Sequence, residues 1–120
     1  MLKLSEDEAR SISSKLKYRF EGATIIAIVQ DYSTNEVLMV GHMNQESLVR
    51  TLTTGYLHLW SLSRNGIWLK GETSGNYQLV EDLLVDCDCD SIVVKVKSLG
   101  PICHTGNKTC FFRKLLNINF

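Results

Sequence analysis

The sequence has no long apolar segment, no net charge, no repeat and no low-complexity tract. No apolar run approaches the roughly 20 residues of a membrane-spanning helix, and acidic residues stand near the start where a signal peptide would be apolar. We therefore expect a cytoplasmic protein without a membrane partner, whose thiols stay reduced. With 13 basic and 13 acidic residues the formal charge is zero, which excludes a global basic surface for nucleic acid.

The paired C-x-x-C spacing of most structural zinc sites is also missing, although the chain has 4 cysteines. At 120 residues we expect one domain, residues 1–120, with no linker. A chain of this size buries roughly two thirds of its unfolded surface and folds without disulfides. The cysteines therefore need an explanation other than disulfide bonding.

Alternation and capping patterns predict an α+β fold that is predominantly β. Ser5 and Glu8 form a capping-box pattern for an N-terminal helix through about Lys17, and a second short helix over 45–54 has Asn44 as its cap and Gly55 as its end. With only two helices there is no regular βαβ alternation, so we expect a mixed sheet that curls on itself. The predicted short strands, about seven, cover residues 23–30, 36–41, 56–61, 67–69, 77–85, 91–97 and 111–116.

Two kinds of metal ligand are interleaved between residues 86 and 90. In an extended segment Asp86, Asp88 and Asp90 would point to one face while Cys87 and Cys89 point to the other. Carboxylates suit Mg²⁺ and thiolates suit Zn²⁺, so this segment could serve two ions. The three carboxylates would repel one another if buried without a cation, and solvated acidic turns are a common alternative.

The spacing of Cys87, Cys103 and Cys110, with 15 and then 6 intervening residues, leaves three readings open. Three thiolates could hold a catalytic zinc, which commonly has three protein ligands and a water. The cysteines could instead be inert reduced thiols. A third alternative is a structural Cys₄ site that also uses Cys89.

Two further segments carry candidate site residues. Residues 70–76 place Lys70 beside hydroxyls and exposed backbone amides, as in a phosphate-binding loop, or form a plain surface turn. His104 follows Cys103 directly and is suited to proton transfer, or to a supporting hydrogen bond near the metal.

Together these segments resemble the phosphoribosyl-AMP cyclohydrolase family over about residues 22–114. The resemblance rests on five motifs spread along the chain. They are Met43-Asn44 with Glu46 and Leu48, Trp60-Ser61 with Ser63-Arg64, Trp68 with 70–76, Asp86-Cys87-Asp88 with Asp90, and Gly100-Pro101 with Cys103-His104-Thr105-Gly106 and Cys110-Phe111.

The resemblance implies a homodimer of half-barrel subunits that share zinc across the interface. Cys87 of one subunit would join Cys103 and Cys110 of the other, and Asp86, Asp88 and Asp90 would bind magnesium. It further implies zinc-dependent hydrolysis of the N1–C6 bond of the adenine ring of 1-(5-phosphoribosyl)-AMP, in the third step of histidine biosynthesis. We expect His104 to be catalytic; the expected contacts to this nucleotide are Arg64, Lys70, Glu72, Thr73 and Ser74.

One departure from the family pattern concerns substrate binding. Leu62 stands where the family usually has arginine, which leaves Arg64 as the better phosphate partner. Two rival functions remain at this point. A deaminase would attack the same carbon but release a different nitrogen, and a structural zinc module would have no catalytic water.

Overall fold

A computed structural model describes residues 1–118 and shows one six-stranded sheet with two α-helices. The strand order is β4-β3-β2-β1-β6-β5, and β1 and β6 run parallel whereas the other neighbours are antiparallel. The helices are α1 (Glu6–Ser13) and α2 (Gln45–Thr54), and the strands are β1 (Ile25–Asp31), β2 (Val37–Met43), β3 (His58–Ser61), β4 (Gly66–Leu69), β5 (Gln78–Val85) and β6 (Ser91–Ser98).

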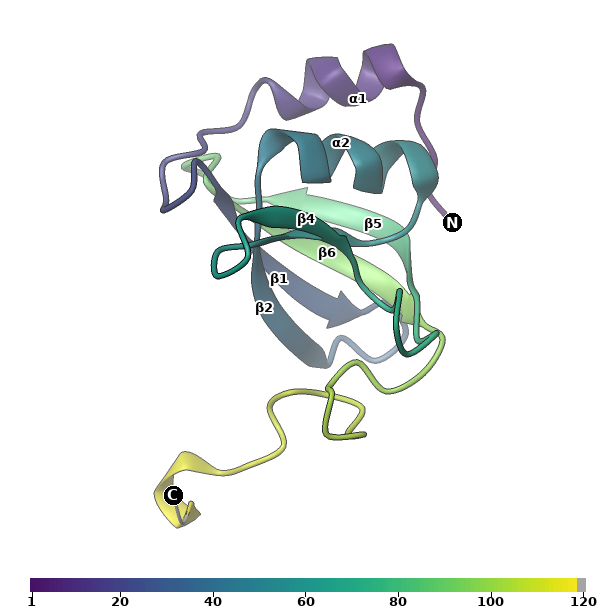
Figure 1. Ribbon diagram of the computed structural model, residues 1–120, viewed down its shortest axis with the longest axis vertical. Helices are drawn as coiled ribbons and strands as arrows, with labels where there is room; N and C mark the ends of the chain where they lie inside the picture. Colours follow the sequence, from purple (N-terminus) through teal and green to yellow (C-terminus); the bar gives the residue numbers. More distant parts are fainter. Residues whose placement is uncertain (119–120) are drawn as a thin grey trace.

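The sheet curls into a half-barrel, as predicted, and both helices lie on one side of it (Figure 1). The curl brings the segment before β3 against the opposite edge strand β5, where Leu57 N donates to the Gln78 carbonyl at 3.0 Å. In β1 every second residue is buried, including Ile25, Ala27 and Val29, which is the period-2 pattern of a half-buried strand. The apolar, β-branched run over 23–30 allowed this strand to be predicted from the sequence.

The helix ends follow the local chemistry that the sequence indicated. Ser5 and Glu8 form the expected capping box at α1, the Asn44 side chain accepts from Ser47 N at 2.8 Å, and Gly55 ends α2 in the left-handed conformation with φ of 80°. Helix α1, however, ends at Ser13 rather than near Lys17. The backbone N–H of Lys17 bonds to the Cys89 carbonyl at 2.7 Å, so a tertiary contact replaces the last helical turn.

The strand predicted over 111–116 is wrong. The chain there is irregular and ends in a short 3₁₀ helix, Leu115–Asn117, that pairs with no strand. The N–H of Cys110 still donates to the Leu38 carbonyl of β2 at 2.8 Å, but after Cys110 the polypeptide extends away from the sheet (Figure 1). The apolar side chains of 111–116 therefore have no neighbouring strand. The described part of the chain thus has six strands instead of about seven.

Residues 86–90 are also not extended, because they form the turn between β5 and β6. Cys89 takes the left-handed conformation with φ of 59°, which breaks the predicted alternation of faces.

None of the described helices has the length and apolarity required to cross a bilayer.

Candidate active site

One cleft collects most of the predicted site residues. It has a volume of about 410 Å³, which is within the usual range for a small-molecule site. The β3–β4 hairpin, the loop that follows β4 and the loop that follows β6 form its walls. The predicted residues that line it are Arg64, Lys70, Glu72, Thr73, Ser74, Cys103 and His104.

The loop over 70–76 is held in a fixed shape by its own backbone. Gly75 N donates to the Gly71 carbonyl at 2.7 Å, and Gly71 has φ of 97°, a conformation that glycine adopts without strain. A Cβ at Gly71 would lie 2.7 Å from the carbonyl carbon of Asn76, so the turn has no room for a larger residue. The loop therefore presents Glu72, Thr73 and Ser74, all exposed, on one rim of the cleft.

Two cationic side chains lie beside the ring of Trp68, which also lines the cleft. The Arg64 guanidinium lies 5.6 Å, and the Lys70 ammonium 5.7 Å, from the centroid of the Trp68 ring. Both distances are within cation–π range, so the ring helps to position both charges. Arginine and lysine at one rim provide the local anion-binding groups that a protein of zero net charge needs.

Two thiols meet at the base of the loop after β6. Cys103 is buried, and the Thr105 hydroxyl donates to its Sγ at 3.0 Å. This hydrogen bond is the main cause that lowers the pKa of Cys103, with smaller contributions from Cys110 and the charge of Lys70. Desolvation and the neighbouring Cys103 raise the pKa of Cys110. The thiolate form of Cys103 is therefore favoured, whereas deprotonation of Cys110 as well requires a cation beside the pair.

Cys87, the third predicted zinc ligand, does not lie in this cleft. It is exposed in the turn before β6, whereas Cys103 follows the end of β6. That strand runs from Ser91 to Ser98, so its ends are roughly 23 Å apart at the rise of an extended chain. A single copy therefore does not bring the three cysteines together, and Cys89 likewise lies on the distant turn.

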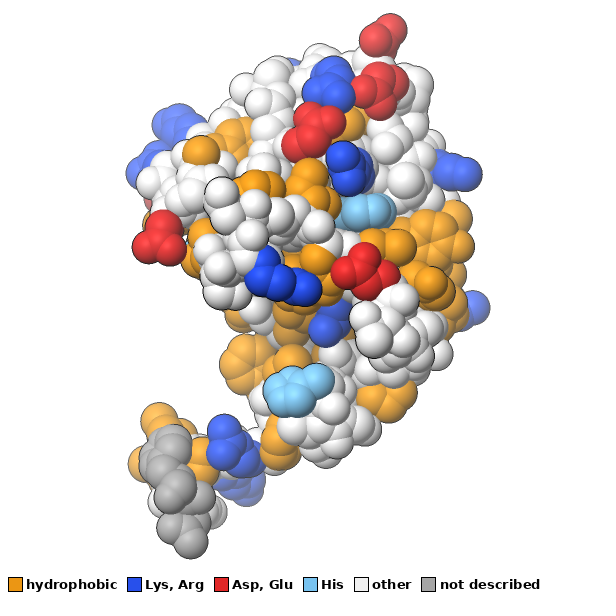
Figure 2. Space-filling model, viewed as in Figure 1, with side chains coloured by type: hydrophobic (Ala, Val, Ile, Leu, Met, Phe, Trp, Pro, Cys, Tyr) orange, Lys and Arg blue, Asp and Glu red, His pale blue; other side chains and the backbone are white. Residues whose placement is uncertain are grey.

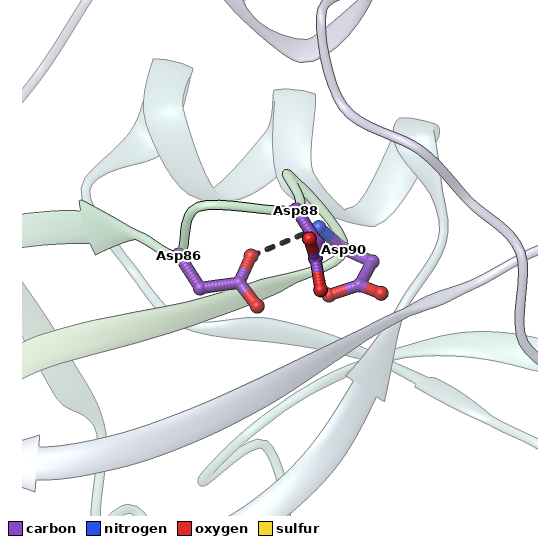
Figure 3. A group of neighbouring side chains, drawn as sticks. All are labelled: Asp86, Asp88 and Asp90. Atoms are coloured by element: carbon purple, nitrogen blue, oxygen red, sulfur yellow. Dashed lines mark hydrogen bonds between the residues drawn. The ribbon is translucent and has the colours of Figure 1, made fainter.

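The aspartates on this turn do converge. Single carboxylate oxygens of Asp86, Asp88 and Asp90 all lie within 4.8 Å of one another, and Figure 3 shows the three side chains side by side. Asp86 Oδ1 accepts from the backbone N–H of Asp90 at 3.1 Å and of Ser91 at 3.2 Å. Desolvation acts to raise the pKa of the Asp86 carboxyl, but these backbone donors hold it below its usual value.

The aspartate cluster is thus a possible metal-binding site, built by a turn instead of by the predicted strand alternation. Three adjacent carboxylate oxygens match the ligand preference of a hard divalent cation. Within residues 1–118 this is the one group of at least three His, Cys, Asp or Glu side chains close enough to hold an ion.

Three contributors to the cleft had no individual role in the sequence-based prediction. Trp68 lines the cleft, Thr105 bonds to Cys103, and the Asn76 amide donates to the Pro101 carbonyl at 3.0 Å. The sequence offered one signal for Thr105, which lies two residues after a predicted ligand. The contact between Asn76 and Pro101 joins residues 25 positions apart and had no local signal.

The fold and the cleft define a small half-barrel enzyme that combines anion-binding side chains with paired thiols. Comparison with known proteins agrees: residues 39–112, more than half of the chain, match the family model described as Phosphoribosyl-AMP cyclohydrolase. The chain belongs to the phosphoribosyl-AMP cyclohydrolase family, which confirms the resemblance and the prediction of an enzyme of this kind.

Individual relatives match between 76% and 98% of the chain. A phosphoribosyl-AMP cyclohydrolase of Sulfurisphaera tokodaii is 60% identical over 117 residues, which span 98% of this chain and 99% of the relative. One from Pyrobaculum calidifontis is 54% identical over 88% of this chain and 82% of its own length. One from Methanothermobacter thermautotrophicus is 57% identical over 76% of this chain and 66% of its own length.

Proposed function

We propose that this phosphoribosyl-AMP cyclohydrolase opens the adenine ring of its substrate at a zinc site that a second copy of the chain completes. The observation that carries the proposal is the cleft itself. It places Cys103, His104 and the cationic rim of Arg64 and Lys70 around one volume of about 410 Å³. The reaction is hydrolysis of the N1–C6 bond of 1-(5-phosphoribosyl)-AMP in histidine biosynthesis.

The zinc ligands would be Cys103, Cys110 and the partner subunit's Cys87. The first two thiols are close enough to shift each other's pKa, and soft sulfur donors suit zinc. Zinc bound by three protein ligands keeps an open position and supplies water with a pKa of about 7. Because β6 separates Cys87 from the other two cysteines by roughly 23 Å, the exposed turn that carries it is available to a second copy instead.

His104 is the candidate for proton transfer. It lines the cleft, is exposed to solvent and directly follows the buried Cys103. Hydrolysis adds oxygen to C6, breaks N1–C6 and delivers a proton to N1, while the exocyclic nitrogen remains as a carboxamide. An imidazole at this position can accept a proton from water and return it to the departing ring nitrogen.

The substrate phosphates would bind to the rim of the cleft. Arg64 and Lys70 provide charge, and the hydroxyls of Thr73 and Ser74 on the loop that Lys70 begins provide donors. Glu72 on the same loop can accept hydrogen bonds from ribose hydroxyls.

Magnesium would bind to Asp86, Asp88 and Asp90, whose oxygens already converge. These residues flank Cys87, so the turn of the partner subunit that reaches the cleft would bring both its thiol and its carboxylates. The cation would thereby help to neutralise substrate phosphate near Arg64 and Lys70.

The test is to incubate the purified chain with phosphoribosyl-AMP and follow ring opening with and without a zinc chelator. We expect turnover, loss of turnover on chelation and its recovery when zinc is restored. The product should have the mass of substrate plus water, whereas a deaminase would release ammonia and change the mass differently. Turnover that persists in metal-free protein would contradict the proposal.

Cys89→Ser separates the catalytic site from a structural Cys₄ module. Cys89 lies on the turn that carries Cys87 and lines an apolar groove instead of the cleft. We therefore expect this variant to keep its zinc and its activity, while Cys103→Ser loses both. Loss of zinc and folding in Cys89→Ser would favour the structural module.

A further inference from the structure

The C-terminal segment after Cys110 carries large apolar side chains that the rest of the described chain leaves exposed. Phe111 is 59% exposed, Phe112 45%, Leu115 74% and Leu116 96%. Figure 1 shows this segment extending away from the sheet, and Figure 2 shows hydrophobic side chains gathered on it. We call residues 111–118 the tail. A soluble chain rarely displays such a run unless another surface covers it.

The opposite end of the same molecule carries an apolar groove of about 500 Å³. Its walls are the N-terminal segment, α1 and the last part of β5, and α2 contributes Leu48 and Leu52. Leu84 and Val85 remain 52% and 54% exposed on the β5 wall. The other apolar side chains that line it are Leu2, Leu4, Ile12, Leu16, Leu83 and Ile92.

We propose that the tail of one copy lies in the groove of a second copy, and that the exchange is reciprocal. The proposal rests on the shared zinc site of the proposed function. Val85 and Cys89 line the groove on either side of Cys87, and Phe111 directly follows Cys110. If Cys110 and the partner subunit's Cys87 bind one zinc at about 2.3 Å each, the tail begins at the mouth of the partner's groove.

The reach of the tail fits this arrangement. Eight residues span at most about 28 Å when extended, which is enough to pass from the turn of 86–90 along the β5 wall toward Leu2 and Leu4. A two-fold dimer needs a surface that is complementary to itself. This chain carries both halves, a protruding apolar segment and an open apolar groove.

The charges at the mouth of the groove complement those of the tail. The tail carries Arg113 and Lys114. The groove is lined by one cation, Lys15, and one anion, Asp82, which has no ion-pair partner among the described residues. Asp86 and Asp88 stand exposed at the mouth of the groove. Opposite charges at the rim of an apolar contact favour one orientation of the tail over the reverse one.

Disulfide trapping tests where the tail lies. Two chains of different mass, one carrying Leu84→Cys and the other Leu116→Cys, are mixed with zinc bound and oxidised mildly. We expect a covalent heterodimer whose linked peptides contain positions 84 and 116. Arg50→Cys is the matched control because it is exposed on α2 outside the groove, and it should not link to position 116. A third chain carries both Leu84→Cys and Leu116→Cys, and a disulfide that closes between these positions within a single chain would overturn the proposal.

Sedimentation measures the contribution of the tail to the dimer. Leu115→Ser with Leu116→Ser removes four leucines from the two reciprocal contacts, and we expect the dimer dissociation constant to rise about 100-fold. Both side chains are exposed in the single copy, so its folding should not change. Leu84→Ser should raise the dimer dissociation constant too. In the combined variant the constant should rise by less than the product of the two separate increases.

The two proposals fail in distinguishable ways. If the tail variant dimerises as tightly as the wild type, while the wild type retains zinc-dependent turnover, the tail is not in the groove and the proposed function stands. If the wild type has no zinc-dependent turnover, the proposed function itself is wrong. At protein concentrations far above the new dissociation constant, the tail variant should recover its zinc and its activity.

Discussion

The Asn76 side chain donates from Nδ2 to the Pro101 carbonyl at 3.0 Å and thereby ties the two loops that wall the cleft. The Asn76 side chain also packs closely against Gly100, because a Cβ at position 100 would clash with Asn76 Oδ1. Pro101 stands two residues before Cys103, so the bond fixes the start of the segment that carries Cys103 and His104. Asn76 thus positions groups that it does not touch.

We expect Asn76→Ala to reduce kcat/KM by about 10-fold to 100-fold, because small displacements of reacting groups are costly. The melting temperature should fall only slightly, since one hydrogen bond contributes about 1 kcal/mol. Gln30→Ala is a matched control, because the Gln30 amide also donates to a backbone carbonyl, that of Asn35, at 2.9 Å, and neither residue lines the cleft. Equal activity in the two variants would show that the loop tie has no role.

Thr105 should tune how firmly the thiols hold zinc. Its hydroxyl donates to Cys103 Sγ at 3.0 Å and lowers the pKa of that thiol, which favours the thiolate that binds metal. We expect Thr105→Val to weaken zinc binding by about 10-fold to 100-fold and Thr105→Ser to restore it. Competition with a chelator of known affinity measures this. Equal zinc affinity in the valine and serine variants would contradict the prediction.

Much of the fold followed from local patterns in the sequence. The apolar, β-branched run of β1, the Ser5 capping box and the turn at Gly55 each depend on residues near one another, and each was predicted. The end of α1 was not, because the bond from Lys17 N to the Cys89 carbonyl joins distant parts of the chain. The false strand over 111–116 has the composition of a strand but no sheet edge beside it.

The candidate site likewise has features that local sequence predicts and features that depend on contacts between distant residues. Residue types and spacing indicated the aspartates, the thiols and the loop over 70–76, because these choices reflect ligand chemistry. Only the structure shows that Cys87 lies at the far end of β6 from Cys103. Likewise the aspartates converge through a turn in which Cys89 has φ of 59°, a conformation that alternation along a strand does not predict.

Divalent cations should stabilise the folded protein through the aspartate cluster, and one substitution in the cluster should remove most of this stabilisation. Without a cation the converging carboxylates of Asp86, Asp88 and Asp90 repel one another, so Asp88→Asn should raise the melting temperature in chelator. With Mg²⁺ at ten times its dissociation constant the wild type should gain about 1.4 kcal/mol, and the variant should gain much less. Asp7→Asn, at an exposed acidic residue of α1 outside the cluster, is the control. A Mg²⁺ response that is equal in the wild type and Asp88→Asn would contradict the assignment.

Mixing two inactive variants tests whether one site draws ligands from two subunits. Cys87→Ser and Cys103→Ser should each be inactive, because each lacks one proposed zinc ligand in every site. In a mixed dimer, one site combines Cys103 and Cys110 of the Cys87→Ser chain with the intact Cys87 of the Cys103→Ser chain. The other site lacks both Cys87 and Cys103. Random reassortment of subunits should therefore restore about one quarter of wild-type activity.

The control for this experiment is a mixture of Cys103→Ser with Cys110→Ser. These two cysteines lie beside each other in one copy, so every site in their mixed dimers still lacks one ligand and activity should stay absent. If activity also recovered in the control mixture, the recovery in the first mixture would reflect contamination and not shared sites. No recovery in the first mixture, with mixed dimers verified by mass, would show that Cys87 acts within its own subunit or not at all.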